Sequence, residues 1–137
     1  MKKKVLVVDD SDLLHKIYPS ILKRHKDHEL EILHALNGQE ALGQLAQHPD
    51  TDLVLLDINM PVMSGLEFLK HRQSEEVFLD VPVVVVSTRG REQDIQSGVE
   101  AGAMGYLTKP FKADELLGLI GKVFESQATG AASASKG

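Results

Sequence analysis

Apolar residues gather in five short runs along the chain, and the segments between the runs show helical periodicity. The runs cover residues 4–8, 29–34, 53–56, 83–87 and 105–108. Three of them are rich in Val and Leu with no alternation of polar residues, which is typical of strands buried on both faces of a parallel sheet. The pattern therefore predicts five strands, three of them covered on both faces.

The intervening segments carry apolar residues three or four positions apart, which is the spacing of one helix face. The clearest examples are the set Leu14, Ile17, Tyr18, Ile21 and Leu22 and the last amphipathic stretch, residues 112–124. Asn37 with Glu40, and Ser64 with Glu67, match the capping-box pattern, which predicts that a helix begins at each place. Regular alternation of strands and helices predicts right-handed crossovers and a doubly wound α/β fold with helices on both faces of the sheet.

Length and composition exclude several classes of protein. The 137 residues fit one domain, and 42% hydrophobic content excludes a wholly disordered chain. The absence of cysteine excludes disulfides, zinc ribbons and thiol nucleophiles. A net charge of −5 argues against sequence-independent binding of nucleic acid. No uninterrupted apolar run exceeds four residues, so no membrane span or signal peptide is expected.

These observations predict a cytoplasmic domain over residues 1–125. Residues 126–137 are rich in Ala, Ser and Gly and carry no apolar period. We therefore expect them to form a flexible tail or a truncated linker.

Polar residues stand where the predicted strands end. Asp9 and Asp10 follow the first strand, Asp57 the third, Ser87 ends the fourth, and Lys109 follows the fifth. Because ligands of open parallel sheets bind at the carboxyl ends of the strands, we expect these groups to converge at one edge. Three carboxylates and one lysine from distant parts of the sequence would then share one site.

The expected charge at this edge is not balanced. Two like charges 4 Å apart repel by about 4 kcal/mol at an effective dielectric constant near 20. One lysine cannot neutralise three carboxylates, so either a carboxyl group takes up a proton or a divalent cation binds. Ligands that are all oxygen favour Mg²⁺, with Mn²⁺ as a substitute. A carboxylate beside Mg²⁺, a lysine and a hydroxyl suits phosphoryl transfer, with Asp57 on the central strand as the nucleophile.

An ordered set of motifs resembles a known family. It consists of Asp9 and Asp10, Asp57, Met60 and Pro61, Gly65, Ser87, and Lys109, Pro110 and Phe111. The set resembles the receiver domain of bacterial two-component response regulators, and most closely the stand-alone receivers of chemotaxis. The resemblance covers about residues 3–124. It implies a flavodoxin-like sheet of five parallel strands in the order 2-1-3-4-5.

The resemblance also implies a role for each residue at the site. Asp57 would accept a phosphoryl group from a histidine kinase or a histidine phosphotransfer protein. Asp10, Asp57 and the backbone carbonyl of Asn59 would bind Mg²⁺, with Asp9 helping through water. Lys109 would bind the phosphoryl oxygens.

A further group of residues would pass the signal on. The resemblance implies that Ser87 moves to the phosphate, that Tyr106 changes between exposed and buried rotamers, and that the peptide bond from Lys109 to Pro110 is cis. The surface formed by the fourth helix, fifth strand and fifth helix would then change its affinity for a downstream protein. The resemblance therefore implies a signalling domain of chemotaxis or of a phosphorelay, which is not an enzyme beyond assisting its own phosphorylation and slow dephosphorylation.

Two alternatives stay open at this stage. A receiver-like binding module that works without phosphorylation is one, because Arg89 would flank the expected phosphate and could hinder its chemistry. The other is a phosphatase of the haloacid dehalogenase type, whose paired acidic motif the segment from Asp57 to Asn59 loosely resembles. That class needs a second acid where Asn59 stands.

Overall fold

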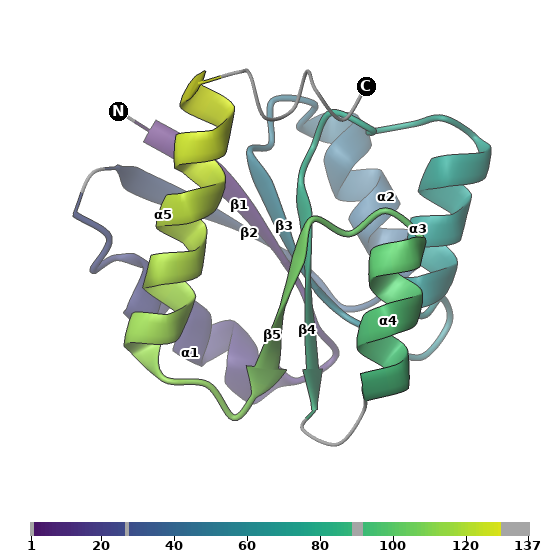
Figure 1. Ribbon diagram of the computed structural model, residues 1–137, viewed down its shortest axis with the longest axis horizontal. Helices are drawn as coiled ribbons and strands as arrows, with labels where there is room; N and C mark the ends of the chain where they lie inside the picture. Colours follow the sequence, from purple (N-terminus) through teal and green to yellow (C-terminus); the bar gives the residue numbers. More distant parts are fainter. Residues whose placement is uncertain (1, 27, 89–91, 130–137) are drawn as a thin grey trace.

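Strands and helices alternate along the chain in the computed structural model (Figure 1). The structure describes residues 2–26, 28–88 and 92–129. The elements in chain order are β1 (Lys2–Val8), α1 (Asp12–Leu22), β2 (Glu29–Ala35), α2 (Gly38–Gln47), β3 (Leu53–Asp57), α3 (Gly65–Ser74), β4 (Val83–Thr88), α4 (Glu92–Glu100), β5 (Gly105–Lys109) and α5 (Ala113–Thr129). All five predicted strands are confirmed.

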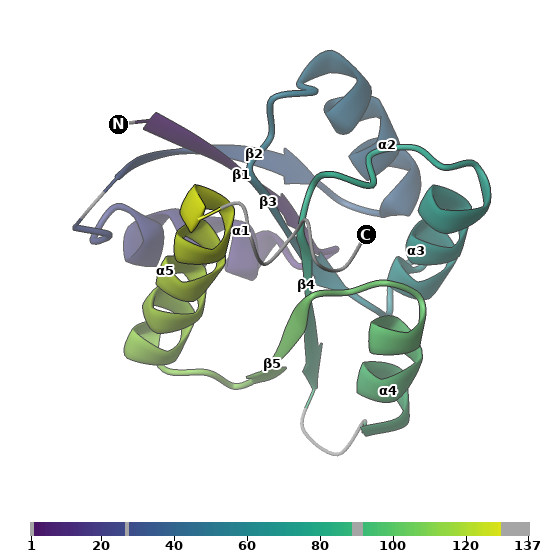
Figure 2. The ribbon, with the colours of Figure 1, turned by 45° about the horizontal axis from the view of Figure 1, so that its top comes forward.

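The strands form one parallel sheet in the order β2-β1-β3-β4-β5, which confirms the predicted topology. Helices α1 and α5 cover one face of this sheet, and α2, α3 and α4 cover the other (Figures 1 and 2). Strand β3 is central and is buried along its whole length. The doubly wound arrangement therefore brings the ends of β1, β3, β4 and β5 together at one edge.

The two faces explain why the strand sequences show no alternation. In β1, Leu6 and Val8 belong to the apolar cluster beneath α2, α3 and α4, whereas Val5 and Val7 belong to the cluster beneath α1 and α5. All four side chains are at most 1% exposed. Successive side chains thus point to opposite faces of the sheet. Because both faces are buried, the odd and the even positions of residues 5–8 are all apolar.

Helix α5 extends further along the chain than the sequence predicts. Helix α5 continues to Thr129, so residues 126–129, which the sequence places in the tail, are helical. Gln127 donates a side-chain hydrogen bond to the backbone oxygen of Asp52 at 3.1 Å. Lengthening an existing helix is also far less costly than starting one. Helix α5 therefore continues four residues past the predicted boundary at residue 125, and residues 130–137 lie outside the described residues.

One buried cation organises the loop before β4. Arg72 is 6% exposed and donates through Nε to the oxygen of Phe78 and through Nη2 to the oxygens of Leu79 and Val81, at 3.1–3.2 Å. Burial lowers the pKa of its guanidinium. Carbonyl dipoles, rather than a carboxylate, therefore satisfy this charge and fix the path of the loop.

The length and hydropathy of the helices show whether any of them could cross a membrane. Within the described ranges, no helix is both long enough and apolar enough to span a bilayer.

Candidate functional site

Three carboxylates and one lysine meet at the carboxyl edge of the sheet, as the sequence predicts. Asp9 follows β1, Asp57 ends β3 and Lys109 ends β5. Asp9 is 2% exposed and Asp57 is 8% exposed, whereas Asp10 is open to solvent. One carboxylate oxygen from each of Asp9, Asp10 and Asp57 lies within 4.8 Å of the other two. These three aspartates are called the acidic cluster below.

Lys109 is placed between the two buried carboxylates. Its Nζ donates a hydrogen bond to Asp9 Oδ2 at 2.7 Å and lies 3.6 Å from Asp57 Oδ1. The shorter contact is a charge-assisted hydrogen bond, and the longer one is an ion pair without a close hydrogen bond. The charge of Asp57, at the end of the central strand, is thus less completely neutralised than that of Asp9.

The environment of Asp57 acts on its ionisation. Burial is the largest cause and raises the pKa of this carboxyl to about 6. The positive charge of Lys109 opposes the rise, while the negative charges of Asp9 and Asp10 add to it. Asp57 is therefore mostly ionised at pH 7, but its charge is held at a cost in free energy.

The acidic cluster fits a hard divalent cation. All its side-chain donors are oxygens, they lie close enough to share one ion, and Lys109 leaves negative charge uncompensated. Mg²⁺ prefers such ligands and binds proteins through a few carboxylates while keeping several waters. Asn59 follows β3 and uses its side-chain amide on Asp94 Oδ2 of α4, at 3.4 Å. The part of its backbone carbonyl in metal binding stays a prediction.

Ser87 brings an unused hydroxyl to the same edge. It is 1% exposed and directly follows Val86, which pairs with Asp57 across the sheet. Among the described residues its Oγ has no hydrogen-bond partner. A buried hydroxyl without a partner is uncommon, because it loses its bonds to water and gains none. Its hydroxyl is therefore available to a group that enters the site.

Two other predicted site residues, Tyr106 and Pro110, lie on or directly after β5. The peptide bond between Lys109 and Pro110 is cis, as the resemblance implies. Tyr106 lies on β5 and is 54% exposed, which corresponds to one of the two expected rotamers. Arg89 lies outside the described residues.

Two histidines at the site are absent from the sequence-based prediction. His15 Nε2 lies 2.6 Å from the backbone oxygen of Asp9, and His15 Nδ1 lies 2.7 Å from Nδ1 of His34. The two rings meet edge to face. The spacing of these residues in the chain gives no sign of the contact, because it depends on how α1 lies against the end of β2.

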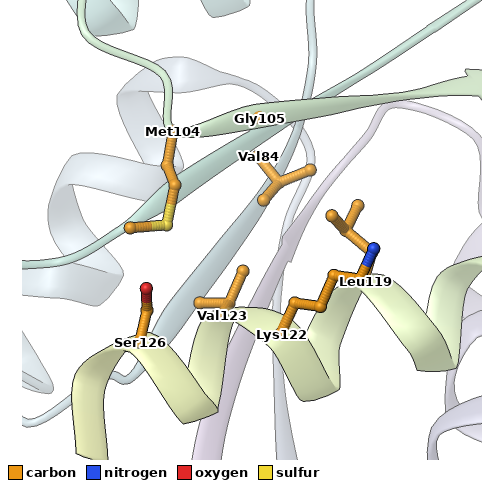
Figure 3. Close-up of a pocket in the computed structure, with 7 residues that line it drawn as sticks. All are labelled: Val84, Met104, Gly105, Leu119, Lys122, Val123 and Ser126. Carbon is orange, nitrogen blue, oxygen red and sulfur yellow. The ribbon is translucent and has the colours of Figure 1, made fainter. Parts of the chain in front are cut away.

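A cavity of about 340 Å³ lies away from this edge, between α5 and the start of β5 (Figure 3). Its lining includes Met104 and Gly105 together with Leu119 and Val123 of α5. Gly105 and Lys109 are the two ends of β5, four residues apart, which is about 13 Å in a strand. The cavity is therefore separate from the acidic cluster.

Comparison with known proteins identifies the family. A family model described as the response regulator receiver domain matches residues 5–121. The chain is 37% identical over 120 residues to the phosphate regulon transcriptional regulatory protein PhoB of Escherichia coli, covering 88% of this chain and 51% of PhoB, so it spans about half the length of that relative. It is 36% identical over 110 residues to a chemotaxis protein CheY homolog of Campylobacter jejuni, covering 79% of this chain and 82% of the homolog.

Solved structures agree with this result. NtrX from Brucella abortus in complex with ADP superposes with a TM-score of 0.83 at 27% identity, covering 98% of this chain and 30% of NtrX. A response regulator receiver domain protein from Clostridium thermocellum gives a TM-score of 0.81 at 24% identity, covering 93% of this chain and 98% of that protein, and shows the shared fold. Because the family model spans most of the chain, and the CheY homolog is 36% identical and covered over 82% of its length, the chain belongs to the response regulator receiver domain family.

Proposed function

We propose that the chain is a phosphorylation-activated switch whose acceptor is Asp57. The phosphoryl donor is a phosphohistidine of a histidine kinase or a histidine phosphotransfer protein, and the reaction depends on Mg²⁺. The observation that carries the proposal is a buried carboxylate 3.6 Å from the ammonium group of Lys109 and close to two further carboxylates. That combination supplies a carboxylate nucleophile, a positive charge that can pair with the phosphoryl oxygens, and carboxylates that can hold a cation.

The chain's own residues account for the transfer. An ionised oxygen of Asp57 attacks phosphorus, and the P–N bond breaks with its electron pair returning to the donor imidazole. Lys109 would pair with the phosphoryl oxygens, and the Oγ of Ser87, which has no hydrogen-bond partner among the described residues, would donate to one of them. Asp10, Asp57 and the backbone carbonyl of Asn59 would hold Mg²⁺, with Asp9 acting through water. When bound, the cation neutralises charge on the phosphoryl oxygens.

The output is a change in protein contacts. In our proposal Ser87 and Lys109 bind the phosphate, Tyr106 exchanges its exposed rotamer for a buried one, and Pro110 fixes the backbone beside them. A charge-assisted hydrogen bond is worth about 1.5–3 kcal/mol. Moving a population from 1:99 to 99:1 takes about 5.5 kcal/mol. Ser87 alone is therefore insufficient, and Tyr106, Lys109 and a protein partner bound on α4, β5 and α5 share the shift.

The relatives support a signalling role, and we propose chemotaxis or a phosphorelay as the setting. Two relatives that the match covers over most of their length are named chemotaxis proteins, whereas PhoB, of which the match covers 51%, is named a transcriptional regulatory protein. We propose a downstream protein as the target of this receiver.

Intact mass measurement tests the proposed function. The protein is incubated with phosphoramidate and Mg²⁺, and in parallel with EDTA. We expect one phosphoryl adduct in the presence of Mg²⁺, strong reduction with EDTA, and none in Asp57→Asn. The matched control is Asp80→Asn, because Asp80 is exposed and remote from the acidic cluster.

Two results would contradict the proposal. No adduct under conditions that label an ordinary receiver would favour a binding module that works without phosphorylation. Rapid turnover of a generic phosphomonoester, with release of inorganic phosphate, would favour a phosphatase.

A further inference from the structure

Asp9 is held at every polar atom by other parts of the protein. Its carboxylate accepts hydrogen bonds from Lys109 Nζ at Oδ2 and from the backbone N–H of Ser11 at Oδ1, at 2.7 and 2.9 Å. Its backbone N–H donates to the oxygen of Ala35 at 3.1 Å. Its backbone oxygen lies 2.6 Å from His15 Nε2. The contact with His15 alone comes from a titratable side chain that no function described so far uses.

The chemistry of the contact fixes its direction. A carbonyl oxygen only accepts hydrogen bonds. His15 Nε2 therefore carries a hydrogen and donates a hydrogen bond to the backbone oxygen of Asp9. The facing nitrogens, His15 Nδ1 and His34 Nδ1, lie 2.7 Å apart and share one proton between them. His34 thus fixes the ring of His15 from behind, as a second partner on the other imidazole nitrogen.

This pair of rings suits a hydrogen bond rather than a metal. Two imidazole nitrogens on a tetrahedral ion, each about 2.0–2.1 Å from the metal, lie about 3.3 Å apart. The observed 2.7 Å is shorter. In the part of the chain that the structure describes, the acidic cluster is the only group of three or more potential metal-ligating residues, and neither histidine belongs to it.

The contact acts on the peptide unit that joins two members of the acidic cluster. The oxygen that His15 holds belongs to the planar unit between Asp9 and Asp10. Fixing that oxygen therefore sets the direction in which the chain enters Asp10. Strand β2 supports the two peptide units on either side of the Asp9 Cα. The oxygen of Ala35 accepts from the Asp9 N–H, in the unit that joins Val8 to Asp9, and His34, the residue before Ala35, reaches the oxygen of Asp9 through His15.

We propose that His15, held by His34, is a positioning residue for the Asp9–Asp10 peptide and so for the binding of a divalent cation by the acidic cluster. The inference rests on the proposed function, because it assigns a role toward that cation. Partners of metal ligands orient the ligands, and losing such a partner typically weakens metal binding by about 10-fold to 100-fold.

The first test is calorimetric titration of Mg²⁺ into the parent and five variants, one of which is a control. We expect about tenfold weaker binding in His15→Ala and a smaller loss in His34→Ala. His15→Gln should bind nearly as the parent does, because the glutamine amide can replace the Nε2 donor. In the double variant His15→Ala/His34→Ala, the loss of Mg²⁺ binding free energy should be smaller than the sum of the losses in the two single variants, since both residues act through one contact. His71→Ala, an exposed histidine of α3, is the matched control.

The second test reads the contact itself. Long-range ¹H–¹⁵N spectra of the metal-free protein should show a protonated Nε2 on His15, and the Nδ1 shift of His15 should change in His34→Ala but not in His71→Ala. An unchanged His15 Nδ1 shift in His34→Ala would overturn the proposal, and so would parent-like Mg²⁺ binding in a folded His15→Ala protein. Failure of the parent to bind Mg²⁺ or to accept phosphate would instead contradict the proposed function, since the spectra are independent of both.

Discussion

Replacing Lys109 with methionine is expected to lower the free energy of unfolding by about 3 kcal/mol at pH 7 without metal. Lys109 is the cation that contacts both buried carboxylates, at 2.7 Å from Asp9 and 3.6 Å from Asp57. Removing one partner of a buried ion pair leaves the remaining charge desolvated and uncompensated. Methionine keeps most of the apolar stem, so loss of packing contributes little.

The same substitution should nearly abolish phosphorylation. Loss of one preorganised donor to developing charge slows catalysis by about 100-fold to 1,000-fold, and we expect labelling by phosphoramidate to slow by a similar factor. Urea denaturation and timed mass measurements check the two effects. Lys112→Met is the control, because Lys112 is exposed and its side chain lies outside the acidic cluster. Parent-like stability together with a parent-like labelling rate would show that Lys109 is only a surface lysine.

The second large effect is a gain in stability, whereas the first is a loss. Asp57→Asn is expected to stabilise the metal-free protein by about 3 kcal/mol at pH 7. The pKa of Asp57 is raised from 3.8 to about 6, with burial as the main cause. Ionised Asp57 therefore destabilises the folded state, and an uncharged amide of similar size removes that charge.

The pH dependence follows from the raised pKa of Asp57. Below about pH 4 the carboxyl is protonated in both the folded and the unfolded protein, so its ionisation has no effect on stability. Between about pH 4 and pH 6 the unfolded carboxyl ionises while the folded one keeps its proton, so this group makes the parent less stable as pH rises. Above about pH 6 the cost is complete and constant. The advantage of Asp57→Asn should therefore grow across this window and then level off.

Urea denaturation in EDTA at several pH values measures this difference. Asp50→Asn provides a contrast, because a hydrogen bond from Lys4 lowers the pKa of the exposed Asp50 carboxyl. That control should show no gain in stability at pH 7. A difference between Asp57→Asn and the parent that is independent of pH from 4 to 7 would show that Asp57 is not strained by ionisation.

Much of this site could be predicted because its residues follow from the pattern of the strands. The carboxyl ends of parallel strands meet at one edge, so Asp9, Asp57 and Lys109 had to converge once the strands were located. The imbalance of charge followed from counting those groups. The hydroxyl of Ser87, which has no hydrogen-bond partner in the described part of the chain, adds an observation that the sequence could not give, because it depends on which groups lie nearby in space.

Other features depend on contacts that no local pattern encodes. His15 reaches Asp9 only because α1 lies against the end of β2, where His34 meets it. Arg72 is buried although arginine is usually exposed, because three carbonyls of one loop turn toward it. The final turn of α5 has no apolar period, and Gln127 ties it to Asp52 through a polar contact. Each of these is a polar interaction between separate elements or loops, which the periodicity of apolar residues does not detect.

The most direct test of the central claim is to locate the phosphoryl group by residue. The labelled protein is reduced with borohydride, which converts an aspartyl phosphate to homoserine, and is then digested and sequenced by mass spectrometry. The account predicts homoserine at position 57 and nowhere else, and only in protein labelled with Mg²⁺ present. Homoserine at position 9 or 10, or phosphate on a histidine with Asp57 unmodified, would contradict it.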